Sequence, residues 1–182
     1  MGRRVVAVVL PSFRISLVRA RCPDVAPGAP LAVVVDAERD ERALSGGTRI
    51  DDVSSEAREL GVLPGATIAS AKAKCADLRV RVLRPREAVA ALEGLAEMLL
   101  AFGPIVAPLL DRDAVLVDVT GCAHLHARSS GRESDAEAAM LGAIVESVAG
   151  AGFSCRASLA AGPEIALAIA QSTGPPQARR RE

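Results

Sequence analysis

Short apolar runs, each about the length of one β-strand, recur along this sequence. Residues 5–10 and Leu31–Val35 are continuous and rich in valine, which is typical of strands buried on both faces. Residues 80–83, 114–119 and 153–159 also have strand character, and arginines alternate outward in the first of these. No run approaches the roughly 20 apolar residues that a membrane-spanning helix needs. Such strands must be covered by other elements of the same chain.

Segments with helical spacing or helix-capping residues separate these runs. Ser54 and Ser55 suit the N-cap of a helix that stops at Gly61, and Pro163 suits the first turn of a closing helix to residue 171. Further helices are predicted over residues 13–21, 68–75 and 86–102, and from Ser134 onward. This alternation predicts an α/β or α+β sandwich with helices packed on a sheet.

The charges of the chain balance, with 22 basic against 22 acidic residues. A dedicated nucleic-acid binder usually has a basic excess, so any contact with DNA has to come from local patches. The candidates are the arginines of residues 79–86 and the run 179–181, and a solvated face explains both equally well. Half of the residues are hydrophobic, which excludes general disorder. Because aromatic residues are nearly absent, we expect an aliphatic core.

Two patterns bear on metals and redox chemistry. The four cysteines are scattered without a C-x-x-C pair, which favours small buried side chains over a disulfide or zinc framework. Cys122, His124 and His126 alternate along an extended segment, but a lone short motif is weak support for a metal site. We therefore expect no metal and no cofactor. The N-terminus lacks the pattern of a secretory signal, so we expect a cytoplasmic protein.

Three stretches match the motifs of one family in order and in approximate spacing. Residues 55–62, followed by Gly65, are similar to the fingers signature Y-E-A-R-x-x-G-V-x-x-G. Residues 71–78 are similar to A-K-x-x-C-P-D-L, and residues 103–121 to S-P-x-V-E-P followed by E-A-Y-L-D-V-T-G. These motifs are those of the Y-family of translesion DNA polymerases, which the chain resembles over about residues 4–171.

The resemblance implies an α+β fold with a ferredoxin-like palm, a mixed sheet with helices on one face, and a small helical fingers insert. Residues 1–35 and 77–171 then form the palm-like domain, residues 36–76 the fingers-like insert and residues 172–182 a flexible tail. The family's thumb, little-finger domain and clamp-binding tail have no counterpart here. The resemblance therefore implies the N-terminal part of a longer protein.

The departures from the family pattern fall where its chemistry lies. Phosphoryl transfer by two metal ions needs carboxylates that hold both ions. The family's first strand ends in Asp-x-Asp, whose first Asp is a metal ligand, and Val9 stands there in this chain. The family's later hairpin carries Asp-Glu, and here it carries Asp113 and Ala114. The resemblance thus implies a degenerate site at Val9, Asp113 and Ala114, without catalytic residues.

The positions that contact the incoming nucleotide are also changed. The fingers Tyr and Arg of the family correspond to Ser55 and Arg58, so only the arginine remains. Glu164 and Ile165 replace the Asn-Lys pair of the closing helix. Arg14 stands where an aromatic residue of the family checks the sugar.

Three arginines are candidates for binding the phosphate of a nucleotide or of DNA, namely Arg58, Arg79 and Arg81. For Arg58, an ion pair with Glu56 or Asp52 on its own helix and loop is an equal alternative.

The string Thr120-Gly-Cys-Ala-His-Leu125, together with the missing carboxylates, closely resembles the ImuB subgroup, the inactive Y-family-like member of a bacterial mutagenesis cassette. The resemblance implies a non-catalytic scaffold that recruits partners for error-prone translesion synthesis in the SOS response to DNA damage. The implied partners are a RecA-like protein of the ImuA type, an error-prone DnaE-type polymerase and the sliding clamp. The last two would be bound through C-terminal regions outside these residues, and any binding of DNA would be weak.

Two other functions stay open. The first is a weakly active polymerase, in which Asp111, Asp113 and Asp118 supply the missing metal ligands. Asp111 and Asp113 are alternate residues, so both can face the same way. The second is a plain DNA-binding module, whose affinity would fall steeply with salt.

Overall fold

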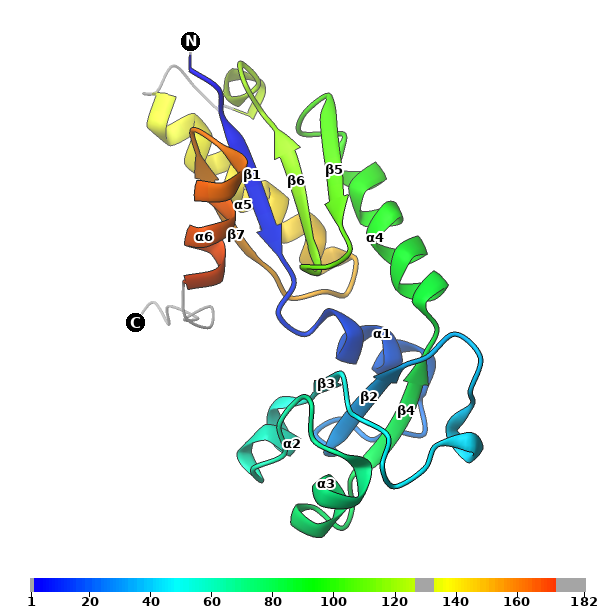
Figure 1. Cartoon of the computed structure of the whole chain (residues 1–182). Helices are drawn as coiled ribbons and strands as arrows, with labels where there is room; N and C mark the ends of the chain where they lie inside the picture. The colour runs from blue at the N-terminus through cyan, green and yellow to red at the C-terminus, as the bar shows by residue number, and fades with distance from the viewer. Residues whose placement is uncertain (1, 127–132, 173–182) are drawn as a thin grey trace. The chain divides into compact units, whose positions relative to one another are not determined.

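The computed structural model describes residues 2–126 and 133–172, which fold into two compact units (Figure 1). The first unit takes the chain up to Pro11 and again from Ala91 onward, and the second is the continuous segment Ser12–Ala90. Each unit has its own β-sheet. No helix in the described ranges is both long and apolar enough to cross a membrane.

A four-stranded antiparallel sheet forms the centre of the first unit. Its strands are β1 (Val5–Val9), β5 (Ile105–Leu109), β6 (Ala114–Asp118) and β7 (Arg156–Ala160), in the order β5-β6-β1-β7. Strand β1 pairs on both edges, and all five of its residues are buried. Its continuous apolar sequence follows from this central place, since neither of its faces meets water.

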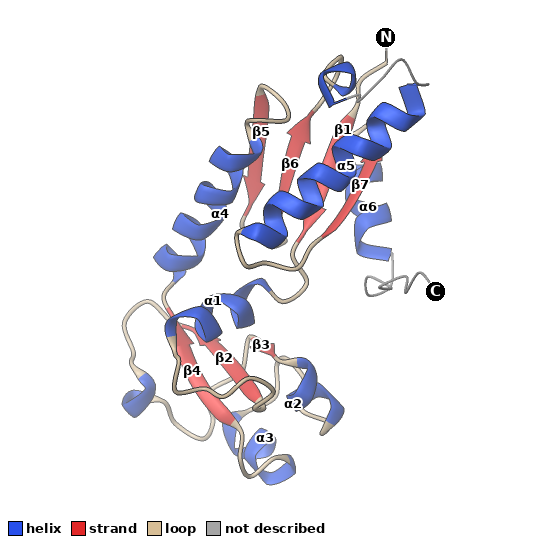
Figure 2. Cartoon of the chain, turned by 180° about the vertical axis from the view of Figure 1, so that it is seen from behind, coloured by secondary structure: helices blue, strands red, loops and turns tan. Residues whose placement is uncertain are grey.

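Helices accompany both faces of this sheet. They are α4 (Pro85–Leu99), which crosses the boundary between the units, α5 (Glu133–Gly150) and α6 (Pro163–Ser172). Helices α5 and α6 lie on opposite faces in both views (Figures 1 and 2). The α+β class is confirmed. The resemblance implied helices on one face of the sheet, whereas in the structure α6 covers the face opposite α5. The short 3₁₀ helix η2 (Ala123–His126) follows β6.

The second unit is built on a mixed three-stranded sheet. Strand β2 (Leu31–Val35) pairs in parallel with β4 (Arg79–Leu83) and antiparallel with β3 (Asp52–Val53). Alternate residues of β2 face two apolar clusters: Leu31 and Val33 pack with α1 (Phe13–Arg21), and Ala32 and Val34 with α2 (Ser55–Glu59) and α3 (Ile68–Lys74). The apolar sequence of β2 is therefore covered on both sides.

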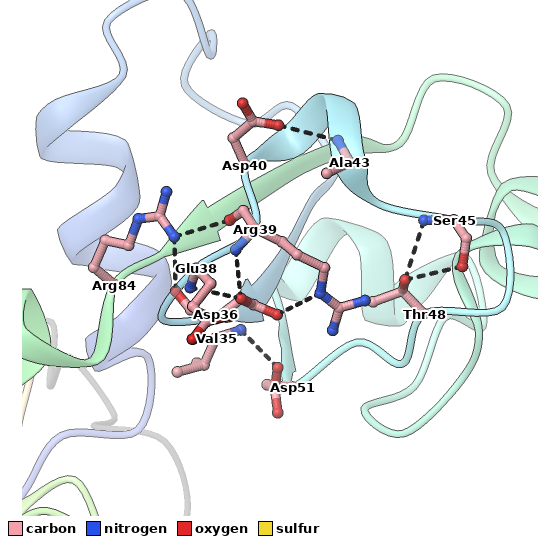
Figure 3. A network of polar contacts seen from close by, with 10 residues as sticks. All are labelled: Val35, Asp36, Glu38, Arg39, Asp40, Ala43, Ser45, Thr48, Asp51 and Arg84. Atoms are coloured by element: carbon pink, nitrogen blue, oxygen red, sulfur yellow. Dashed lines mark hydrogen bonds and ion pairs between the residues drawn. The ribbon is translucent and has the colours of Figure 1, made fainter.

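Hydrogen bonds order the polar stretch between β2 and β3 (Figure 3). The Asp36 carboxylate accepts from the backbone N–H groups two and three residues later, at 2.9 and 2.7 Å, and from Arg39 Nε at 2.8 Å. Asp40 caps the 3₁₀ helix η1 (Glu41–Ala43). Arg84 Nη1 donates to the carbonyl oxygens of Asp36 and Arg39 at 3.3 and 2.9 Å, which ties this loop to the end of β4.

The observed units differ from the domain ranges drawn from the resemblance. Those ranges put residues 12–35 and 77–90 in the palm-like domain, whereas in the structure both segments belong to the second unit. The physical reason is strand pairing: β2 and β4 hydrogen-bond to each other, and neither joins the sheet that contains β1.

Candidate functional site

The two apolar positions of the predicted site are direct neighbours in the first sheet. Val9 at the end of β1 lies opposite Ala114 at the start of β6. Val9 is 8% exposed and Ala114 is fully buried. Both belong to an apolar cluster in which Ala166 and Leu167 of α6 also pack. Neither side chain offers a metal ion an oxygen ligand, and α6 occupies the space above them.

Asp113 is the one carboxylate among the three predicted positions. It ends the turn between β5 and β6 with a φ of +44°, which is uncommon for a residue other than glycine. Its carbonyl oxygen accepts a hydrogen bond from the Leu10 N–H at 3.0 Å, which joins this turn to the end of β1. The structure therefore places Asp113 beside the Val9–Ala114 pair.

The first turn of α6 adds another acidic side chain to this region. Glu164 lies 3.9 Å from Arg112 Nη1, and Arg112 Nε also lies 3.8 Å from Asp111. The Glu164 side chain is 82% exposed, so this ion pair contributes little to stability. Arg112 thus lies close to two carboxylates, those of Asp111 and Glu164.

Asp118 lies far from the other aspartates invoked for a weakly active polymerase. It is the last residue of β6, whereas Asp113 precedes the first, which corresponds to roughly 16 Å along the strand. Asp118 accepts hydrogen bonds from Thr120 Oγ1 at 2.6 Å and from Arg3 Nε at 3.2 Å. The Thr120 hydroxyl, with Arg3, lowers the pKa of the Asp118 carboxyl in spite of partial burial. Asp118 and Asp113 therefore cannot bind the same metal ion.

The histidine and cysteine string after β6 is only partly described. The Cys122 thiol contacts the Thr120 carbonyl oxygen at 3.7 Å, and His124 is exposed. The His126 side chain, like the predicted capping residue Ser134 and the tail 173–182, lies outside what the structure describes. Within the described residues, no three His, Cys, Asp or Glu side chains are grouped closely enough to hold a metal ion.

The predicted phosphate-binding arginines lie at two separate places in the second unit. Arg58 is on α2, half exposed, with Nη2 3.9 Å from Asp52 Oδ1. Of its two proposed partners, Glu56 instead pairs with Arg19 at 3.1 Å. Arg79 and Arg81 are alternate residues of β4 and line one cavity, which does not include Arg58.

Two residues close to Arg79 and Arg81 were not predicted as site residues from the sequence. Lys72 of α3 lines the same cavity, and Asp24 forms an ion pair with Arg81. Lys72 lies inside a recognised motif, but only folding brings α3 beside β4. Asp24 is 57 residues from Arg81 along the chain, so no local pattern connects them.

Comparison with known proteins gives one family and a set of similar structures. The family model of the impB/mucB/samB family matches residues 8–172. A Y-family DNA polymerase chimera built on Dbh matches with a TM-score of 0.74, and DinB from Sulfolobus solfataricus with a TM-score of 0.71. Both are 20% identical in sequence to this chain, and each alignment covers 94% of it.

This chain spans about half the length of those solved proteins, since the alignments cover 46% of each. At 20% identity the likeness shows the fold. No curated protein sequence gives a significant match.

Proposed function

The chain belongs to the impB/mucB/samB family, and on that premise we propose that it is a non-catalytic palm-and-fingers module of the ImuB subgroup. Its role is to recruit partners for error-prone translesion synthesis after DNA damage, within the cytoplasm. The proposed partners are a RecA-like protein of the ImuA type and, through regions outside these residues, a DnaE-type polymerase and the sliding clamp.

One observation carries the non-catalytic part of the proposal. At the position where a family polymerase needs metal-binding carboxylates, Val9 and Ala114 face each other inside an apolar cluster closed by α6. A divalent cation is held by several oxygen ligands, and one carboxylate cannot replace a set of them. Phosphoryl transfer by two metal ions needs ligands for both ions, and Asp113 alone does not supply them.

Metal binding distinguishes this proposal from a weakly active polymerase. Free Mn²⁺ would be measured by electron paramagnetic resonance while it is titrated with the chain and with its Asp113→Ala variant. We expect the chain and the variant to bind Mn²⁺ equally weakly. A residual catalytic site would bind Mn²⁺ less tightly once Asp113 is replaced.

Primer extension supplies the second measurement. It would be run with the chain, the Asp113→Ala variant and, as a positive control, DinB from Sulfolobus solfataricus. We expect the control alone to extend the primer, and Asp113-dependent incorporation of nucleotides by this chain would overturn the proposal.

A further inference from the structure

A cavity of about 400 Å³ lies in the second unit between α3, β4 and the loop that follows η1. Its lining contains three cations, Lys72, Arg79 and Arg81, and one carboxylate, Glu41. Apolar side chains, among them the nearly buried Ile68 and Leu78, form a smaller part of its lining. The cavity runs along the free edge of β4, and its charged side chains come from β4, from α3 and from the loop after β2.

Two of the cations are available to a ligand. Lys72 and Arg79 are exposed, and neither side chain has a hydrogen bond or an ion pair with any residue in the described ranges. A hydrogen bond from either side chain to an anion would therefore form without breaking an internal contact. Charge-assisted bonds of this type are the strong ones in proteins.

Arg81 is held in place by the protein itself. Its side chain is 20% exposed, forms an ion pair with Asp24, and donates from Nη1 to the Val80 carbonyl oxygen at 3.2 Å. Partial burial opposes the charge, but Asp24 and Glu41 outweigh it and raise the pKa of the guanidinium. Arg81 thus contributes a permanent positive charge in a fixed position.

The carboxylates near the cavity are already bound to the protein. Glu41 Oε1 accepts from the Val82 N–H at 3.3 Å, and Asp24 is paired with Arg81. The three cations exceed these two carboxylates by one charge, and Lys72 and Arg79 are the two that form no ion pair among the described residues. The same carboxylates would repel a polyanionic strand laid across the cavity, so the site favours a compact anion.

We propose that this cavity binds the phosphate group of a small phosphorylated molecule. Lys72 and Arg79 bind the phosphate oxygens, and Arg81 supplies the fixed charge. The site is separate from Arg58, the position that matches the nucleotide-contacting arginine of the family. It does not depend on the non-catalytic role proposed above.

Calorimetric titration of the chain with inorganic pyrophosphate and with adenosine monophosphate tests the proposal. EDTA in the buffer keeps metal ions from bridging the anion to a carboxylate. We expect both probes to bind, and Lys72→Gln/Arg79→Gln to weaken both by about tenfold or more, since two charge-assisted hydrogen bonds are lost. Arg86→Gln is the control, because Arg86 is exposed and lies outside this cavity.

Amide chemical shifts of the labelled chain give the position of the bound anion and show that each variant is folded. Shifts clustered at the lining residues support the proposal. It fails if neither probe binds, if Arg86→Gln weakens binding as much as the double variant, or if Arg58→Gln abolishes binding and the double variant does not. Binding of octathymidylate without binding of either small probe would likewise overturn it.

Discussion

Ala114 lies in a closely packed part of the first unit. Its side chain is fully buried among Val9, Ala166 and Leu167. A glutamate at this position has to place a bulky charged group in an apolar cluster. We expect Ala114→Glu to lower the free energy of unfolding by roughly 3 kcal/mol or more, measured by urea denaturation.

Ala107 provides the matched control for this charge. It lies on the same face of the neighbouring strand β5 but is exposed. Ala107→Glu should change the free energy of unfolding by no more than about 0.5 kcal/mol. If the two variants are equally stable, the cluster beneath α6 is not closed as described.

Asp36 makes the stability of the loop after β2 depend on pH. Hydrogen bonds from the backbone N–H groups of Arg39 and Glu38 lower the pKa of its carboxyl from 3.8 to about 2. A carboxyl whose pKa is lower in the folded chain stabilises it above the ordinary pKa, and that contribution disappears as the pH falls through the folded value. The stabilisation by Asp36 is therefore expected to decline between about pH 4 and pH 2.

The variant Asp36→Asn keeps an oxygen that can accept these hydrogen bonds but removes the charge. We expect its urea midpoint to be lower than that of the unmodified chain at pH 7, with the difference shrinking below pH 4. Glu38→Gln is the control, because its side chain makes no hydrogen bond or ion pair with the described residues. A difference that is the same at pH 7 and pH 2 would contradict the role of the Asp36 charge.

At the scale of elements, one hydroxyl joins helix α2 to strand β2. Ser54 is the N-cap of α2 and is 3% exposed. Its Oγ accepts from the Ala57 N–H at 3.4 Å and from the Leu31 N–H at 3.1 Å. Ser54→Ala leaves both donors without this acceptor, so we expect a loss of roughly 1–3 kcal/mol of unfolding free energy.

Ser55→Ala is the matched control for this cap, since Ser55 is exposed and adjacent. Thermal or urea unfolding of both variants would show the difference, and equal stabilities would mean that Ser54 does not join the two elements.

Elements with strong local signals were predicted closely. Strand Leu31–Val35 and helix Phe13–Arg21 have the predicted bounds, while the helix predicted over residues 86–102 spans Pro85–Leu99. Strands β3 and β5 were not predicted as strands. Strand β3 has only two residues, and β5 contains Pro108, which a central strand does not tolerate. Because β5 is an edge strand, its proline needs no partner on the outer side.

The candidate site could be predicted only in part, because its contacts join segments that are distant in the sequence. Motif matches locate Val9, Asp113 and Ala114 one by one, but strand register puts Val9 opposite Ala114. No local spacing signals that α6 packs over this pair, or that Lys72 and Arg79 line one cavity. Contacts of this kind depend on tertiary packing between segments distant in the chain.

At the scale of the whole molecule, the second unit is continuous in sequence and contains two apolar clusters of its own. A chain of this size buries enough surface for marginal stability. We therefore expect the fragment 12–90 to fold alone, with a dispersed amide spectrum and cooperative urea unfolding.

Ile50→Ala tests whether folding of that fragment depends on its core. Ile50 is 1% exposed, so its loss should cost about 2–5 kcal/mol and leave the fragment largely unfolded. A fragment without cooperative unfolding would show that the second unit depends on the first.

The surface charges of the whole chain set its affinity for DNA. Basic and acidic residues are equal in number, and at least eight arginines form ion pairs with carboxylates: Arg3, Arg4, Arg19, Arg21, Arg39, Arg58, Arg81 and Arg112. A cation already paired with a carboxylate contributes less to the release of counterions from DNA. Other described cations, among them Lys72, Lys74, Arg79 and Arg86, have no such partner among the described residues.

We therefore expect weak binding of a labelled primer–template duplex in a fluorescence anisotropy titration across a salt series. The logarithm of the binding constant should fall with the logarithm of salt concentration with a slope no steeper than about −3, because each phosphate neutralised contributes about −0.9. Tight binding with a slope of about −6 or steeper would mean that ion pairs open to contact many phosphates, and the chain would then act as a DNA-binding module.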